Sequence, residues 1–141
     1  MNKVAIVYWS GTGNTEKMAN CIAEGVKEVG GEAVLLSPGE FSADSFKDYG
    51  AVAFGCPSMG SEQLEEDEFE PMFAGLEGSL SGKKIALFGS NGWGDGQWMR
   101  DWRDRCSAAN LFEEEGLIIN EAPDEAGQET CRELGRGLAK W

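Results

Sequence analysis

Short apolar runs alternate with amphipathic helical patterns along the whole chain of 141 residues. The runs have the length of buried strands, and the segments between them carry apolar side chains at helical spacing. Strands that are apolar on both faces and alternate with helices form parallel sheets covered on both sides. Strands are expected at residues 3–9, 33–36, 51–56, 84–89 and 116–120, and helices at 14–29, 64–80, 97–110 and 124–140.

This alternation predicts an α/β fold with a doubly wound, five-stranded parallel sheet and helices on both faces. A chain of this length can bury a sizeable core, and we expect residues 1–141 to form a single domain. Residues 40–50 have a mixed pattern and are expected to cover the core. Ligands of such sheets bind beyond the C-terminal ends of the strands, at the point where the strand order reverses.

Three loops rich in Gly and polar residues leave the strands at that edge. The first lies between a strand and a helix and reads Ser10-Gly11-Thr12-Gly13-Asn14-Thr15. Unpaired N–H groups and the helix dipole at a helix N-terminus bind anions, and glycines let the backbone approach closely. The loop holds no Lys or Arg, so neutral dipoles would hold the anion. It lacks the Gly-Lys-Ser/Thr of a Walker A loop, and Glu16 stands where a dinucleotide fingerprint has its third Gly.

This hexapeptide resembles the FMN phosphate loop of flavodoxins. The second loop, Pro57-Ser58-Met59-Gly60-Ser61-Glu62, follows Gly55-Cys56 and is similar to the flavin loop of the short-chain members. The resemblance implies that Met59 covers the inner face of the isoalloxazine ring, that Gly60 presents its carbonyl to flavin N5, and that Glu62 accepts from N3–H. Because Gly tolerates a positive φ, the Gly60 peptide is expected to flip when N5 gains a proton, which favours the neutral semiquinone. Taken alone, the segment is also compatible with an ordinary tight loop bearing a surface Glu.

The third loop reads Ser90-Asn91-Gly92-Trp93-Gly94-Asp95-Gly96. A Trp flanked by glycines on a loop is explained by a flat ligand stacked on the indole. By resemblance, Trp93 covers the outer flavin face, and the N–H groups of the loop point at the N1 and O2 side of the ring. Trp98 and Trp102 are expected to be packing residues, and Trp9 to pack beside the phosphate loop. Glu121 lies where the chain after the fifth strand could approach the ribityl chain or the ring.

The resemblance also implies the flavodoxin-like strand order 2-1-3-4-5 and a non-covalently bound FMN. The chain would be a low-potential one-electron carrier that shuttles between semiquinone and hydroquinone for partner redox enzymes. No catalytic residue and no metal site are expected. The predicted cofactor-binding residues are Ser10, Gly11, Thr12, Gly13, Asn14, Thr15, Pro57, Ser58, Met59, Gly60, Ser61, Glu62, Ser90, Asn91, Gly92, Trp93, Gly94, Asp95 and Gly96. Pro57 departs from the pattern, since many members have Ser or Thr there.

Two other functions use related folds. An FMN-dependent NAD(P)H oxidoreductase needs room for a nicotinamide over the ring, and Trp93 on the outer face argues against that enzyme. A signalling receiver domain needs a phosphoacceptor Asp at the end of the third strand, where this chain has Cys56-Pro57. The electron carrier is therefore the leading hypothesis, and the oxidoreductase is the alternative.

The formal net charge is −13, and the chain contains no His. This charge disfavours binding to nucleic acid or to an anionic membrane and steers the protein toward basic partners. We expect a monomer that docks transiently on redox enzymes with basic patches. An acidic run would lie next to the ring and disfavour additional negative charge on the flavin; it could equally be a solvated helix face, and both interpretations can hold. The run consists of Glu62, Glu65, Glu66, Asp67, Glu68 and Glu70.

The four cysteines, Cys21, Cys56, Cys106 and Cys131, are far apart and form no C-x-x-C pair. A zinc site would need all four thiolates to converge, because no His is present. Reduced, mostly buried thiols in a cytosolic protein are the simpler expectation. No apolar segment approaches the length of a transmembrane helix, so the protein is expected in the cytoplasm.

Overall fold

The computed structural model describes residues 1–92 and 94–141. The strands are β1 (Lys3–Tyr8), β2 (Glu32–Leu36), β3 (Ala51–Gly55), β4 (Lys84–Asn91), β5 (Asn110–Leu111) and β6 (Leu117–Asn120). The α-helices are α1 (Asn14–Glu28), α2 (Phe69–Leu76), α3 (Gln97–Arg105) and α4 (Glu125–Lys140). Short 3-10 helices occupy Pro38–Glu40, Ala43–Asp48 and Glu77–Ser79, and the second of them accounts for most of the stretch 40–50 that had a mixed pattern.

The strands form one parallel sheet in the order β2-β1-β3-β4-β5, which confirms the predicted order. The fifth position of the sheet is divided between two segments, because both β5 and β6 pair in parallel with β4. The sequence predicted only the second of these segments. β4 is also longer than predicted: Ser90 and Asn91, expected in a loop, belong to the strand and pair with Ile119 and Asn120.

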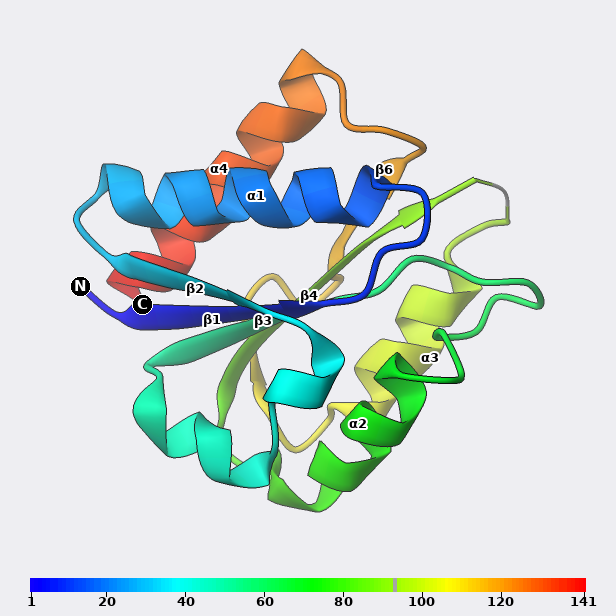
Figure 1. Ribbon diagram of the computed structural model, residues 1–141, viewed down its shortest axis with the longest axis horizontal. Coiled ribbons are helices and arrows are strands. Elements are labelled where there is room, and N and C mark those ends of the chain that lie inside the picture. The colour runs from blue at the N-terminus through cyan, green and yellow to red at the C-terminus, as the bar shows by residue number, and fades with distance from the viewer. Residues whose placement is uncertain (93) are drawn as a thin grey trace.

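Two apolar cores lie on the two faces of the sheet, because successive side chains of a strand point to opposite faces. In β1, Val4 and Ile6 belong to the core under α1 and α4. Ala5 and Val7 belong to the core that contains Phe54 and the side chains of α2 and α3. Figure 1 shows α1 and α4 on one side of the sheet and α2 and α3 on the other. The helices therefore cover both faces, as the alternation of strands and helices predicted.

Two predicted helices are shorter in the structure. The range 64–80 contains α2 only from Phe69 onward, so most of the acidic run precedes the helix as a loop. Pro71 then falls in the first turn of α2, where its missing N–H costs no helical hydrogen bond. The range 97–110 contains α3 only as far as Arg105, because the chain turns at Cys106 and Asn110 joins the edge of the sheet.

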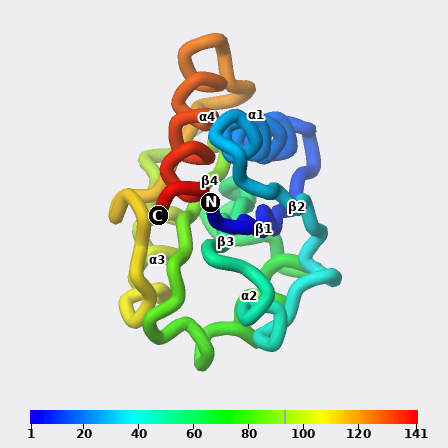
Figure 2. Tube along the Cα trace, turned by 90° about the vertical axis from the view of Figure 1, so that its left-hand side faces the viewer, coloured from blue at the N-terminus to red at the C-terminus, as the bar shows by residue number. Residues whose placement is uncertain are grey.

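Helices α1 and α4 pack closely, and Figure 2 shows them side by side. Glycines allow this approach: a Cβ at Gly25 would lie 2.0 Å from the carbonyl oxygen of Arg132, and one at Gly135 would lie 2.0 Å from that of Ile22. Cys21 and Cys131 are buried in the same core, and Cys56 and Cys106 in the other, as expected for structural thiols. Within residues 1–92 and 94–141, no helix is long and apolar enough to cross a membrane.

We expect Gly135→Ala to destabilise the protein by about 3 kcal/mol, because the added methyl group would meet helix backbone and force α1 and α4 apart. Urea unfolding at neutral pH measures the effect. Gly75→Ala is the matched control: Gly75 lies in α2 with no atom within 4 Å of the added Cβ. Ala favours a helix by about 1 kcal/mol over Gly, so the control should be neutral or slightly stabilising. Equal effects of the two substitutions would contradict the close packing.

Candidate functional site

A cavity of about 220 Å³ opens at the C-terminal edge of the sheet, where β1, β3 and β4 end. Segments from four places in the sequence meet around this strand-end cavity. Its lining residues are Trp9, Gly11, Thr12, Asn14, Pro57, Ser58, Met59, Ser90, Gly92 and Glu121. The predicted edge of the sheet is therefore the one that carries the cavity, and all three predicted loops contribute to its wall.

The first loop is a cradle of backbone N–H groups at the start of α1. Gly13 takes a φ of 97° at the helix N-cap, a conformation that favours glycine. The Ser10 Oγ accepts hydrogen bonds from the N–H groups of Gly13 and Glu16, each at 3.2 Å, and so shapes the loop from within. The N–H groups of Gly11, Thr12, Asn14 and Thr15 donate to no acceptor in the described part of the chain. Free N–H donors at the N-terminus of a helix form an anion site.

Hydrogen bonds join this cradle to the end of β4. The Ser90 N–H donates to Thr15 Oγ1 at 3.4 Å, and the Ser90 hydroxyl donates to the carbonyl oxygen of Glu121 at 3.0 Å. The Glu121 N–H in turn donates to the carbonyl oxygen of Asn91 at 2.8 Å. Glu121 is held at a φ of 60°, and its carboxylate lies beside Gly92, 3.2 Å from where a Cβ would stand. The chain after β6 therefore delivers a negative charge to the cavity.

The second loop is tied to its neighbours before it turns. The Ser58 N–H donates to the carbonyl oxygen of Ser90 at 3.0 Å. The Glu62 N–H then donates to the carbonyl oxygen of Met59 at 2.9 Å, which closes a tight turn with Gly60 and Ser61 at its centre. Ser61 is the third residue of this four-residue turn and has a φ of 65°, and a positive φ at that position of a β-turn usually requires Gly. Glu62 has a φ of 49°, so two successive residues other than Gly hold strained backbone here.

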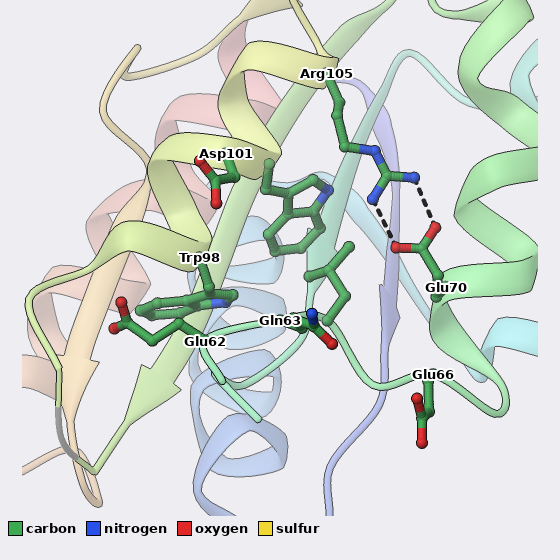
Figure 3. Close-up of a pocket in the computed structure, with 9 residues that line it drawn as sticks. Glu62, Gln63, Glu66, Glu70, Trp98, Asp101 and Arg105 are labelled. Atoms are coloured by element: carbon green, nitrogen blue, oxygen red, sulfur yellow. Dashed lines mark hydrogen bonds and ion pairs between the residues drawn. The ribbon is translucent and has the colours of Figure 1, made fainter. Parts of the chain in front are cut away.

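The carboxylate of Glu62 has an unsatisfied acceptor. Its Oε1 is buried and receives no hydrogen bond from the described residues. This atom lies against Gly94, where a Cβ would approach it to 2.0 Å. In Figure 3, the Glu62 carboxylate lies beside the indole of Trp98. A buried carboxylate oxygen without a donor is costly, so this position requires an N–H or O–H group from outside the described chain.

The third loop is smaller than predicted, since Ser90 and Asn91 belong to β4. Gly92 lines the cavity, and Trp93 lies outside the described residues. Asp95 is turned away: its Oδ1 and its carbonyl oxygen each accept from the Arg100 guanidinium at 3.0 Å. Gly96 forms the N-cap of α3 with a φ of 90°. The structure therefore places Asp95 and Gly96 at the junction with α3 and not at the wall of the cavity.

The acidic run is only partly a solvated face. The Glu65 side chain is buried and accepts from the N–H groups of Asp67, Glu68 and Phe69 at 2.8 to 2.9 Å. Burial alone would raise the pKa of the Glu65 carboxyl, but these N–H groups hold the pKa below its ordinary value. Glu65 is therefore a charged cap of α2.

Two further carboxylates of the run have partners. The Arg105 guanidinium donates to both oxygens of Glu70 at 2.7 Å, as the dashed lines in Figure 3 show. Glu68 accepts from the Trp9 indole N–H at 2.7 Å. Fewer carboxylates of the run are therefore exposed and without a partner than the number of its acidic residues indicates.

The structure brings the three predicted loops together, but it divides their residues by role. Gly11, Thr12 and Asn14 line the cavity, as do Pro57, Ser58 and Met59, and Ser90 and Gly92. Ser10, Gly13 and Thr15 shape the cradle from behind. Gly60, Ser61, Glu62, Asn91 and Gly94 do not line the cavity.

Trp9 and Glu121 also line the cavity, although neither was among the predicted cofactor-binding residues. Their positions carried a weak signal, since Trp9 directly precedes the phosphate loop and Glu121 follows the last strand.

These features define a class of site. An anion cradle at the first strand end, a cavity lined by both apolar and polar residues, and an unsatisfied acceptor at Glu62 suit a mononucleotide with a planar ring. FMN fits this donor and acceptor set, because its phosphate accepts hydrogen bonds and its ring carries an N–H donor. The molecule is thus a doubly wound α/β protein with a mononucleotide site at its switch point.

Comparisons with known proteins agree with this class. A family model described as flavodoxin matches residues 6–135. The flavodoxin of Clostridium beijerinckii is 47% identical over 135 residues, which cover 95% of this chain and 97% of that protein. The flavodoxin of Megasphaera elsdenii is 44% identical over 137 residues, or 97% and 98% of the two chains. The solution structure of the two-electron reduced M. elsdenii flavodoxin superposes with a TM-score of 0.87, at 45% identity, over 98% of this chain and 99% of that one.

The chain belongs to the flavodoxin family. It is an FMN-binding electron carrier and not an enzyme, so the oxidoreductase alternative is not favoured.

Proposed function

We propose that FMN lies in the strand-end cavity with its phosphate on the free N–H groups of Gly11, Thr12, Asn14 and Thr15. The ring would lie between the second loop, at Met59, and the third loop, with its N3–H directed at the unsatisfied Oε1 of Glu62. The proposed site residues are those of loops 10–15 and 57–62 and residues 90–94 of the third loop, to which we add Trp9 and Glu121; Asp95 and Gly96 are left out because they belong to the start of α3. The free N–H cradle, joined at Thr15 to the end of β4, is the observation that carries this proposal.

We further propose that the chain works as a low-potential one-electron carrier. Bound FMN supplies the redox chemistry, because it accepts two electrons in separate steps. Of the described residues that line the cavity, none is Lys or Arg, and Glu121 adds a negative charge. Additional negative charge in such a site is disfavoured by Coulomb repulsion, which salt only partly screens. Cycling between the one-electron and two-electron reduced forms at low potential follows from this charge pattern.

The turn at Met59–Glu62 supports a role for Gly60. The strained φ of 65° falls on Ser61, whereas Gly60 keeps an ordinary φ and has no atom within 4 Å of an added Cβ. In the mirror-related turn, the residue at the Gly60 position takes the positive φ and Ser61 is relieved. The peptide between them would then reverse its carbonyl group. Gly60 would thus present this carbonyl to the ring at small conformational cost.

The first test compares FMN with riboflavin, which lacks the phosphate. We expect the apoprotein to bind FMN at least roughly 100-fold more tightly, because two hydrogen bonds to a charged phosphate are worth about 3 kcal/mol. Quenching of flavin fluorescence at fixed ionic strength measures both affinities. Equal affinities would show that the cradle does not hold the phosphate, and failure to take up FMN would overturn the proposed site.

The second test concerns Gly60→Ala. A positive φ costs a residue with a side chain about 1 kcal/mol, so the variant should lower the first one-electron midpoint potential by about 40 mV. Spectroelectrochemical titration measures this potential, and urea unfolding of the apoprotein should show little change because the added methyl group meets open space. Gly75→Ala, on α2, is the control and should leave the potential unchanged. An unaltered potential in the Gly60 variant would contradict the turn reversal.

We also propose that the partners are redox enzymes with basic docking patches and that the carrier is a cytoplasmic monomer. The net charge of −13 supports such partners, and the buried thiols suit a reducing compartment. Electron transfer to a basic acceptor protein should slow at least severalfold between low and physiological ionic strength. Stopped-flow kinetics measure this rate, and sedimentation velocity checks the monomer. A rate independent of salt would contradict electrostatic docking.

A further inference from the structure

The loop at 57–62 is closed at its base by one unusual hydrogen bond. The Glu65 N–H donates to the Sγ of Cys56 at 3.3 Å, so the chain enters and leaves the loop at the same point. Cys56 is itself immobilised: its N–H donates to the carbonyl oxygen of Phe88 at 3.1 Å, and its carbonyl oxygen accepts from the Trp98 indole at 3.2 Å. Burial raises the pKa of the Cys56 thiol to about 12, so the sulfur remains a neutral acceptor. We call this pair of residues the base clamp.

The side chain of Glu65 fastens the clamp to α2. Its Oε1 accepts from the N–H groups of Glu68 and Phe69, and its Oε2 accepts from that of Asp67. The carbonyl oxygen of Glu65 also accepts from the Glu70 N–H at 2.8 Å. With only 5% of its surface exposed, Glu65 is a buried charge satisfied entirely by backbone donors. Hydrogen bonds to a charged group of this kind are the strong ones.

The strained turn inside the loop requires such a clamp. Ser61 and Glu62 both have positive φ values, and neither is Gly. Strained backbone of this kind persists only where the surrounding structure over-determines it. On the other side of the turn, the Met59 N–H donates to the carbonyl oxygen of Gln63 at 2.9 Å, two residues before Glu65. The clamp and this bond together define where the turn stands relative to the end of β3.

We propose that Glu65 is a positioning residue of the flavin site. Through the base clamp with Cys56, it holds the backbone of Met59, Gly60 and Glu62 in the position that the flavin ring requires. This inference rests on the proposed placement of FMN in the strand-end cavity. Glu65 does not line that cavity, and its charge acts through the backbone that it fastens. Its effect is therefore on the geometry of the site, beyond the stability that a helix cap contributes.

The matched substitutions are Glu65→Gln and Glu66→Gln. They remove the same charge from adjacent positions, but Glu66 is exposed and accepts no hydrogen bond in the described chain. In Glu65→Gln the amide nitrogen would face backbone N–H groups, so part of the cap is lost. We expect this variant to raise the dissociation constant for FMN about tenfold, equivalent to about 1.4 kcal/mol. It should also narrow the separation of the two one-electron midpoint potentials, whereas Glu66→Gln should change the dissociation constant less than about twofold. Glu65→Asp keeps the charge and should restore part of both properties.

A second variant tests the clamp without changing charge. Cys56→Ala removes the sulfur acceptor, and we expect it to weaken FMN binding and narrow the potential separation in the same direction as Glu65→Gln. If circular dichroism of the apoprotein shows that Glu65→Gln does not fold, the Cys56→Ala variant tests the proposed role of the base clamp in its place.

The inference is overturned if Glu65→Gln matches Glu66→Gln in affinity and in both potentials, even when its urea midpoint is lower. An unchanged dissociation constant and unchanged potentials in Cys56→Ala would overturn it as well. Failure of the unsubstituted protein to prefer FMN over riboflavin would instead count against the proposed placement of the cofactor.

Discussion

The parallel ladder of β1, β3 and β4 is the constraint on which the rest of the structure depends. Because the strands run in the same direction, their C-terminal ends meet at one edge, and three loops distant in sequence come together there. The ladder continues into the loops, since the Ser58 N–H pairs with Ser90 and the Ser90 N–H with Thr15. The site is therefore an extension of the sheet's own hydrogen bonding.

The positions of the loops could be predicted because they follow from the alternation of apolar runs and helical patterns. Where a segment could form either of two local structures, such as a helix or a strand, the local sequence pattern was not sufficient to predict which one forms. The range 64–80 has apolar side chains at helical spacing, yet Glu65 turns inward and caps the helix that begins at Phe69. Likewise, Asn110 and Leu111 continue a helical pattern but pair with β4 at the sheet edge. These outcomes depend on contacts between distant residues.

The roles of single residues could likewise be predicted only where they depend on the local sequence. Gly13 and the loop around it could be identified from sequence, because a left-handed N-cap and free N–H groups are local properties. From the sequence, Glu121 could be named only as a residue after the last strand that could approach the ribityl chain or the ring. Its position at the cavity depends on hydrogen bonds with Ser90 and Asn91 at the end of another strand. Asp95 was predicted at the site by its neighbours in sequence, but the Arg100 guanidinium pairs with it instead.

The divided fifth position of the sheet has a consequence for how the chain can vary in length. Phe112 still donates to the carbonyl oxygen of Ile85, after which the chain turns through Glu113 and Gly116, both at positive φ, and rejoins β4 opposite Phe88. The excursion thus leaves and re-enters the ladder at nearly adjacent places on β4. Pairing with β4 fixes both ends of this segment, whatever residues lie between them. Residues could therefore be added between Glu113 and Gly116 without altering the register of β6 or the position of Glu121 at the cavity.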